Sequence, residues 1–249
     1  MRRLLPFILA ASMLPFAASA ADISVMPVSL SLGARQDRQA VTITNQGDAP
    51  VMLQVEAVAW SQRDGEDHYA PTRELIVNPP MFTVGNGKSQ IVRVGLRDPQ
   101  AGPQEAAYRL IVRQVPAPEA VATQPFAGEM SDPGQIRVLL QLRLPVYVAP
   151  AQPQREQQWR AWRTPAGNVA VEILNKGNVH QTITGLTMRS SDPIAPQATG
   201  SSKVSASVLP GQTRRWELRP TGAAAPSRIE LEAETDSGPQ RVSLALENR

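Results

Sequence analysis

The sequence predicts an all-β protein built from two β-sandwich domains. Almost every readable segment alternates apolar and polar residues, which is typical of strands with one buried face. These short segments are separated by turn signals rich in Gly, Pro, Asn and Asp, such as "NQGDAP" and "VGNGKS". We find no segment with the apolar spacing of an amphipathic helix. The three observations together favour sandwiches of short antiparallel strands.

The first residues have the pattern of a secretory signal peptide. "MRRLLPFILAASMLPFAASA" begins with Arg2 and Arg3, continues as an apolar run and ends in small residues. We expect cleavage after Ala20, which leaves a mature chain of about 229 residues. An uncleaved membrane anchor is the alternative, but two prolines interrupt the run and it is short for a span.

The first domain is expected over residues 21–149. Its strands are predicted at residues 40–45, 51–60, 90–96, 108–115 and 136–148. Near the mature N-terminus the phase of the apolar residues changes between Val25 and Val28. Because a shift of one residue moves each later side chain to the opposite face, we expect this strand to kink at Pro27 and to pass between sheets.

The last strand of this domain, residues 136–148, is unusually long. Its sequence "IRVLLQLRLPVYV" is apolar at alternate positions: Ile136, Val138, Leu140, Leu142, Leu144, Val146 and Val148. The segment before it, residues 116–135, is rich in Pro, Ala and Gly and is predicted to be a long loop between two antiparallel strands. So long an apolar face raises the question of whether it also packs against another protein.

The second domain is expected over residues 150–249, after the proline-rich linker "APAQPQ". The alternation resumes in "NVAVEILNKGN", "QTITGLTMRS", "RIELEAET" and "QRVSLALEN", with a turn at residues 209–211. Many short strands at regular spacing are typical of immunoglobulin-like sandwiches. We therefore predict that both domains are immunoglobulin-like.

Composition and charge exclude several function classes. Loss of Arg2 and Arg3 reduces the 25 Lys and Arg to 23, against 22 Asp and Glu, so nothing favours a nucleic-acid partner. We also predict no membrane insertion after signal cleavage, because no other stretch is long and apolar enough. The absence of cysteine excludes thiolate catalysis and cysteine-ligated metal sites. The sequence carries no catalytic motif that we can identify, so we predict no enzyme and no cofactor.

Two isolated histidines and one acidic turn are the candidates for metal binding. His68 is expected in the polar turn "RDGEDHYAP", and His180 lies in "NKGNVHQT". For His68, a solvated loop side chain is favoured over a metal ligand or a catalytic base. For His180, a packing or capping role is favoured over catalysis. "DGED" lacks the spacing of a calcium loop, so no metal site is predicted.

Arginines are the remaining candidates for binding chemistry. Arg109 starts one predicted strand and Arg143 lies in the later half of the next, so antiparallel pairing would bring both toward the domain junction. Two guanidinium groups there would suit a carboxylate, which the arginine fork binds bidentately. The alternative is that these arginines face solvent on half-exposed strands. Arg113 lies further from the junction.

Five motifs in order resemble the periplasmic chaperones of the chaperone–usher pilus pathway. They are "NPPMFTVGNGKSQIVRV", "YRLIVRQVP", "LLQLRLPVYVAP", "NKGNVHQTIT" and "LPGQTRRW". "YR" and "RLPVYV" are more similar to the archaic, non-classical branch. The resemblance implies two immunoglobulin-like β-sandwiches in an L-shaped arrangement with an interdomain cleft. It also implies a periplasmic location, pilin subunits as partners and delivery to an outer-membrane usher.

The family mechanism is donor-strand complementation, in which the chaperone lends a strand to a pilin subunit that lacks one. The resemblance places the subunit contacts of the donor strand at Ile136, Val138, Leu140 and Leu142. It also implies that the cleft holds the C-terminal carboxylate of the subunit.

The basic residues of the cleft differ from the family pattern. The usual arginine position falls at Ser29 and the usual lysine position at Pro145. We expect Arg109 and Arg143 to replace this pair as the carboxylate anchor. A secreted adhesive or ligand-binding sandwich is the alternative function, and it would need exposed aromatic residues on loops. Whether the free protein covers its donor strand by dimerising or with residues 116–135 stays open.

Overall fold

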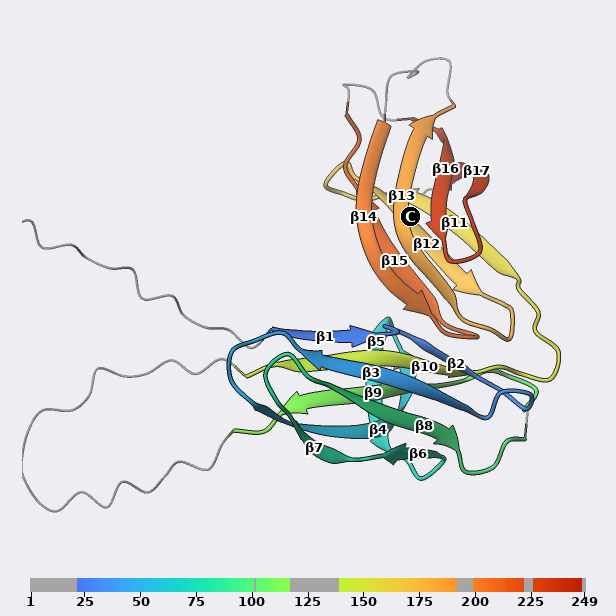
Figure 1. Cartoon of the computed structure of the whole chain (residues 1–249). Helices are drawn as coiled ribbons and strands as arrows, with labels where there is room; N and C mark the ends of the chain where they lie inside the picture. Colours follow the sequence, from blue (N-terminus) through green and yellow to red (C-terminus); the bar gives the residue numbers. More distant parts are fainter. Residues whose placement is uncertain (1–21, 101, 117–138, 192–198, 222–225, 248–249) are drawn as a thin grey trace, which may run out of the picture.

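The computed structural model describes residues 22–100, 102–116, 139–191, 199–221 and 226–247. The regular elements in these ranges are all β-strands, which confirms the predicted all-β class. Figure 1 shows two sandwich units arranged as the arms of an L. No helix in these ranges is long and apolar enough to cross a membrane. The predicted signal peptide, residues 1–20, lies outside the described residues.

The N-terminal unit is a sandwich of two sheets. The first sheet has the order β1 (Ile23–Met26), β3 (Arg38–Asn45), β8 (Ser89–Leu96) and β6 (Leu75–Asn78). The second has the order β2 (Leu30–Leu32), β10 (Gln141–Val148), β9 (Ala106–Gln114), β4 (Val51–Arg63) and β5 (Glu66–Pro71), with β7 (Met81–Val84) also paired to β4. The sequence prediction did not include β5, β6 or β7. His68, expected in a turn, lies within β5, because the turn is formed by Asp64 and Gly65.

The N-terminal segment changes sheets at Pro27, as the change in phase predicted. β1 pairs antiparallel with β3 in the first sheet, whereas β2 pairs parallel with β10 in the second. This crossing leaves β2 only three residues long. The short β2 therefore covers one end of β10 and leaves the other end open.

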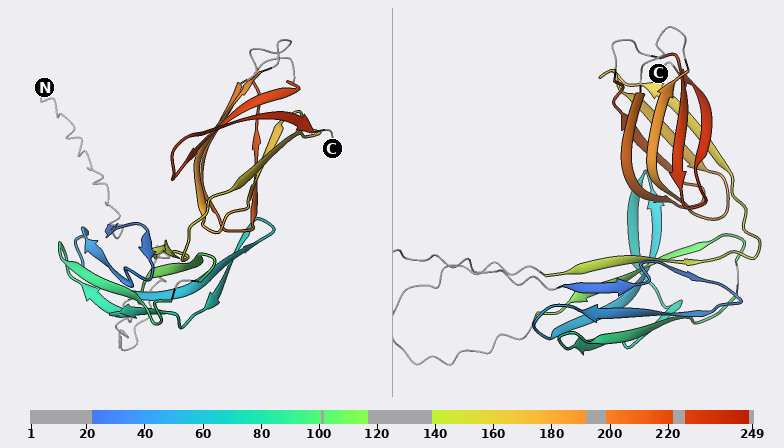
Figure 2. Two further views of the ribbon diagram at one scale, coloured as in Figure 1. Left: turned by 90° about the vertical axis from the view of Figure 1, so that its right-hand side faces the viewer. Right: turned by 45° about the horizontal axis from the view of Figure 1, so that its top comes forward.

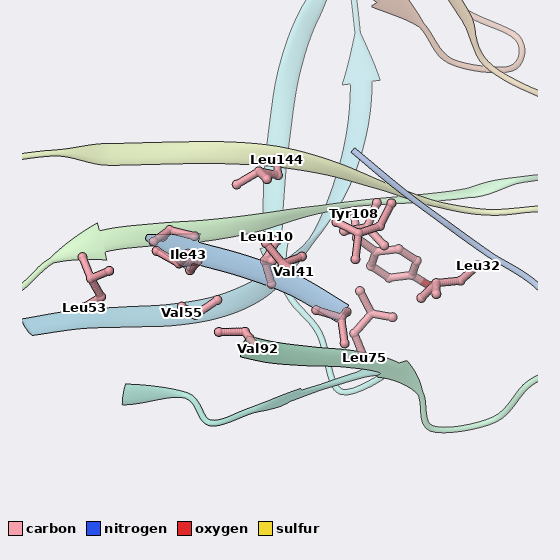
Figure 3. Close-up of a cluster of buried hydrophobic side chains, with 14 of the residues drawn as sticks. Leu32, Val41, Ile43, Leu53, Val55, Leu75, Val92, Tyr108, Leu110 and Leu144 are labelled. Atoms are coloured by element: carbon pink, nitrogen blue, oxygen red, sulfur yellow. The ribbon is translucent and has the colours of Figure 1, made fainter. Parts of the chain in front are cut away.

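The core of the N-terminal unit lies between its two sheets (Figure 3). Ile43 of β3 and Val92 of β8 meet Leu53 of β4 and Leu110 of β9, and all four side chains are fully buried. Burial of a large aliphatic side chain stabilises the fold by about 1.5–3 kcal/mol. Leu144 of β10 joins this core, so the C-terminal half of β10 is an integral strand of its own domain.

Two buried tyrosines predict that stability falls at alkaline pH. Burial raises the pKa of Tyr108 and of Tyr147 above the usual value, and a hydrogen bond from Tyr108 to Glu74 adds to its shift. In the unfolded chain both phenols ionise near about pH 10, while the folded protein keeps them neutral. Unfolding then releases protons, so the free energy of unfolding should fall as the pH rises above about 10. Urea titrations on both sides of this pH measure the effect, and Tyr108→Phe should reduce it. An equal free energy at both pH values would contradict the prediction.

The described residues of the C-terminal unit form seven strands around a second core. Their order is β14 (Thr199–Val208), β13 (Gln181–Ser190), β16 (Arg228–Thr235), β17 (Gln240–Glu247), β11 (Gln157–Arg163), β12 (Val169–Asn175) and β15 (Thr213–Leu218). Within the described residues, β17 and β11 are joined by two parallel residue pairs, so the strands form two layers. The turn predicted at residues 209–211 connects β14 and β15.

Both units contain the same motif, a buried asparagine at the end of a strand. Asn45 ends β3, and its Nδ2 donates to the carbonyl oxygens of Ala49 and Val84. Asn175 ends β12, and its Nδ2 donates in the same way to Val179 and Val208. Each side chain is almost fully buried and fully hydrogen bonded, as a buried amide requires. The turn motifs "NQG" and "NKG" are therefore structural in both units.

The turn at Asn178 fastens the linker between the two units. Asn178 Nδ2 donates to the carbonyl oxygens of Pro103 and Gln152, and its Oδ1 accepts from Gln154 N–H. Gly177 lies so close to the linker that a Cβ there would be 2.4 Å from Gln154 O. The motif "NKGN" therefore brings the first unit, the linker and the second unit into contact.

Candidate functional site

β10 has an open edge along the first part of its length. It pairs with β9 over residues 141–148, but with β2 only over residues 146–148. Among the described residues, no strand pairs with residues 141–145 on the side away from β9. We call this segment the free edge of β10. An exposed strand edge can accept a strand from another chain.

The backbone of the free edge has groups available for such pairing. Gln114 N–H donates to Leu140 C=O at 2.9 Å, and residues 141–148 continue the antiparallel register with β9. Hydrogen-bonding directions alternate along an antiparallel strand. Gln141 and Arg143 therefore direct their N–H and C=O groups away from β9, toward the open side. Pro145 can offer only a carbonyl, so the hydrogen-bonding edge ends there.

One of the predicted donor positions lies within this edge and another immediately precedes it. Leu142 is half-buried and packs against the core of the N-terminal unit. Leu140 is also half-buried but immediately precedes β10, at the border of the sandwich interior. Ile136 and Val138 lie outside the described residues. A strand added to the free edge would extend the second sheet, and its inner face would then continue the apolar interior at Leu140 and Leu142.

A cleft of about 700 Å³ lies between the two units. Ser29 and Pro145, where the family's basic pair would stand, both line it, and so does Arg109. The register explains this grouping, because Arg109 lies directly opposite Pro145 in the β9–β10 pair. Arg155 and Arg214 line the opposite wall from the C-terminal unit. The cleft therefore has cationic groups on both sides.

Arg109 is a largely buried cation with free hydrogen-bond donors. Its side chain is 16% exposed, and its guanidinium carbon lies 3.6 Å from the centre of the Trp60 ring. Its Nη2 is 3.9 Å from Asp67 Oδ2, and it forms no hydrogen bond with any described residue. Nε is completely buried and has no partner. A buried guanidinium in this state favours binding of an anionic ligand.

Arg143 lies on the same sheet face but does not line the cleft. It is opposite Ile111, two residues along from the Arg109–Pro145 pair. Its guanidinium carbon is 5.7 Å from the Tyr69 ring, and its side chain is exposed. Arg113, further along β9, forms an ion pair with Glu56. The structure thus places Arg109 at the cleft, Arg143 beside it on the outer face and Arg113 away from it.

Aromatic stacking and hydrogen bonds join the two units at the back of the cleft. Tyr147 of β10 stacks on His180 with ring centroids 3.5 Å apart and planes 4° apart. His180 Nδ1 is 2.7 Å from Glu105 Oε1, which also accepts from His180 N–H. Trp60, Tyr147 and Leu209 form a small buried cluster across the junction. His180 is therefore a packed interface residue.

Sequence reasoning missed the acidic side of the site. Asp67 faces Arg109 and is held by Gln62, whose other partners lie in the C-terminal unit. Gln62 and Asp67 lie on either side of a polar hairpin turn in the sequence, and nothing in that context indicates that either residue would border the cleft. No group of three or more His, Asp and Glu capable of holding a metal ion is found in the described ranges.

Residues 22–154 match the family model "Pili and flagellar-assembly chaperone, PapD N-terminal domain". The matched segment covers more than half of the chain and contains β9, β10 and the linker. A comparison with curated protein sequences finds no match.

Solved structures of chaperones share the fold of both units. A chain of the CsuC–CsuE chaperone–tip adhesion subunit pre-assembly complex, from the archaic chaperone–usher Csu pili of Acinetobacter baumannii, gives a TM-score of 0.62 at 17% identity, covering 92% of this chain and 100% of that one. A chain of the Salmonella enterica SafA pilin–SafB chaperone complex gives a TM-score of 0.58 at 14% identity, covering 91% of this chain and 98% of that one. The CupB2 chaperone of Pseudomonas aeruginosa gives a TM-score of 0.55 at 16% identity, covering 90% of this chain and 100% of that one. With its family-model match and a fold shared over both units, the chain belongs to the family of pili and flagellar-assembly chaperones.

Proposed function

We propose that this pilus-assembly chaperone works in the periplasm, captures pilin subunits by donor-strand complementation and passes them to an outer-membrane usher. The free edge of β10 is the observation that supports this best. It combines outward-directed backbone groups with apolar side chains at the border of the sandwich interior. These are the two elements that β-augmentation requires. The archaic branch fits the motifs "YR" and "RLPVYV".

The proposed chain consists of a signal peptide at residues 1–20, a chaperone domain at 21–149 and a second sandwich at 150–249. The strands support this division, because β10 ends at Val148 and β11 begins at Gln157. The donor contacts are proposed at Ile136, Val138, Leu140 and Leu142.

The proposed anchor for the subunit's C-terminal carboxylate is Arg109, assisted by Arg143. Arg109 offers free donors in the cleft, and Arg143 adds positive charge on the same face. A subunit strand on the free edge would run past Arg143 toward Pro145, so its end would lie near Arg109. The anchor therefore sets the register of the added strand.

The proposed activity is binding, with no catalysis. A secreted adhesive sandwich is disfavoured because exposed aromatic residues are scarce: Trp60, Trp159 and Trp162 are buried and Trp216 is half-buried. Among the described Phe, Trp and Tyr residues, Tyr69 is the one exposed ring, at 40%.

Gln141→Pro tests use of the free edge. The N–H group of Gln141 points away from β9, so proline removes a donor for the incoming strand and leaves the β9 ladder intact. We expect the variant to remain folded and to bind a pilin subunit at least about tenfold more weakly. Wild type and variant are co-expressed with candidate pilin subunits, and one-to-one complexes are quantified after purification. Undiminished capture by a folded variant would show that another surface is used.

A further inference from the structure

One side chain, Gln62, connects the C-terminal unit to the carboxylate that faces Arg109. Gln62 is 9% exposed at the end of β4. Its Oε1 accepts from Leu209 N–H at 2.9 Å. Its Nε2 donates to Ser207 O and to Asp67 Oδ1, each at 2.9 Å. A single amide thus links the end of β14 to Asp67 on β5.

Asp67 is held near Arg109 but does not form a hydrogen bond with it. Tyr69 Oη donates to Asp67 Oδ2 at 3.2 Å, and this oxygen is 3.9 Å from Arg109 Nη2, beyond hydrogen-bond distance. Burial raises the pKa of Asp67, but hydrogen bonds, first from Gln62 and also from Tyr69, outweigh this effect together with the charge of Arg109, so the pKa lies below its usual value. The ionised carboxylate therefore balances the buried charge while the guanidinium donors stay free.

We propose that Gln62 is a positioning residue for the carboxylate anchor. Through Gln62, the C-terminal unit keeps Asp67 at a distance where Arg109 is electrostatically balanced and still open to a ligand. Without Gln62, Asp67 keeps its hydrogen bond from Tyr69 but loses the one that holds its other oxygen, so it can move onto Arg109 and compete with the incoming carboxylate. This inference rests on the proposed anchor role of Arg109.

A second contact keeps the hairpin of β4 and β5 in place when Gln62 is changed. Arg214 of β15 donates to Gly65 O at the hairpin turn. Figure 2 shows this hairpin extending from the N-terminal unit to the C-terminal unit. The aromatic cluster of Trp60 and Tyr147 with Leu209 also spans the junction. Loss of the Gln62 amide therefore removes one connection among several.

Acetate binding to the full mature chain tests the proposal. Gln62→Met removes all three hydrogen bonds at similar volume. Gln54→Met is the matched control, because Gln54 lies on the same face of β4 and its side chain forms no hydrogen bond with a described residue. Binding is followed by NMR of the Arg109 Nε–Hε group, assigned with Arg109→Lys, and acetamide serves as the uncharged probe.

In the wild type, acetate should shift the Arg109 signal and acetamide should not. Gln62→Met should weaken acetate binding about five- to tenfold, and Gln54→Met should not. Because the weakened binding comes from Asp67, the double variant Gln62→Met with Asp67→Asn should regain at least wild-type affinity. A merely structural role for Gln62 would give no such recovery.

The outcomes separate this inference from the proposed anchor. If acetate fails to shift Arg109 in the wild type, both the anchor and the positioning role are wrong. Equal acetate affinity of wild type and Gln62→Met overturns only the positioning role. Weaker binding that Asp67→Asn does not restore also overturns it, and the anchor stands.

Discussion

Leu140→Glu should abolish the complex between the chaperone and a pilin subunit. In the proposed complex, the substitution places a carboxylate directly before the free edge of β10, where the strand would meet the apolar interior of the added subunit. A charge buried there has no partner, and its cost of at least about 3 kcal/mol corresponds to more than roughly a hundredfold in affinity. Co-purification and titration calorimetry with the captured subunit measure the loss.

The chaperone itself should tolerate this substitution. Leu140 precedes β10 and is not among the side chains that form the core of the N-terminal unit. Leu144→Glu, two alternate positions further on, enters that core and should destabilise the fold. The melting temperature therefore distinguishes loss of binding from loss of folding.

Leu139→Glu is the control on the opposite side of the strand. Leu139 is 46% exposed and out of phase with Leu140 and Leu142. A charge there stays in solvent, so binding should change little. If Leu139→Glu abolished the complex and Leu140→Glu did not, the donor face would be the outer face of β10.

The strand pattern could be predicted because local alternation determines it. The predicted strand at residues 181–190 coincides with β13, and the kink at Pro27 follows from the phase of the residues around it. The predicted strand at residues 136–148 overlaps β10, which begins at Gln141, while residues 136–138 lie outside the described ranges.

The arrangement of the site could be predicted only in part. The expected meeting of Arg109 and Arg143 depends on the register between β9 and β10, and a tight turn does not connect these strands. Without such a turn, register is set by packing of the whole sheet. The observed register places Arg109 opposite Pro145 and moves Arg143 two residues away.

The partners of Gln62 could not be predicted for a different reason. They lie about 145 positions further along the chain, at Ser207 and Leu209. No local pattern encodes a contact between a hairpin of one unit and a strand end of another. Both sides of the cleft are brought together only by the docking of the two units.

Arg109→Met should weaken subunit binding far more than Arg143→Met. Arg109 is largely buried, so loss of the proposed pairing with a bound carboxylate costs about 2–5 kcal/mol, or roughly thirtyfold or more in affinity. Arg143 is exposed, and a solvent-exposed charge contributes up to about 1 kcal/mol. Methionine keeps most of the side-chain volume against Trp60, so the fold should persist. Calorimetric titration of each variant with the captured subunit gives the two losses.

A subunit extended by two glycines shows whether the lost interaction is the one with the C-terminus. The extension moves the carboxylate away from Arg109, so it should weaken binding to the wild type by about as much as Arg109→Met does. The two changes remove the same contact, so combining them should add little. Full additivity would mean that Arg109 contacts another part of the subunit. The order of the two arginine effects follows from the register, because only Arg109 lies beside Pro145 in the cleft.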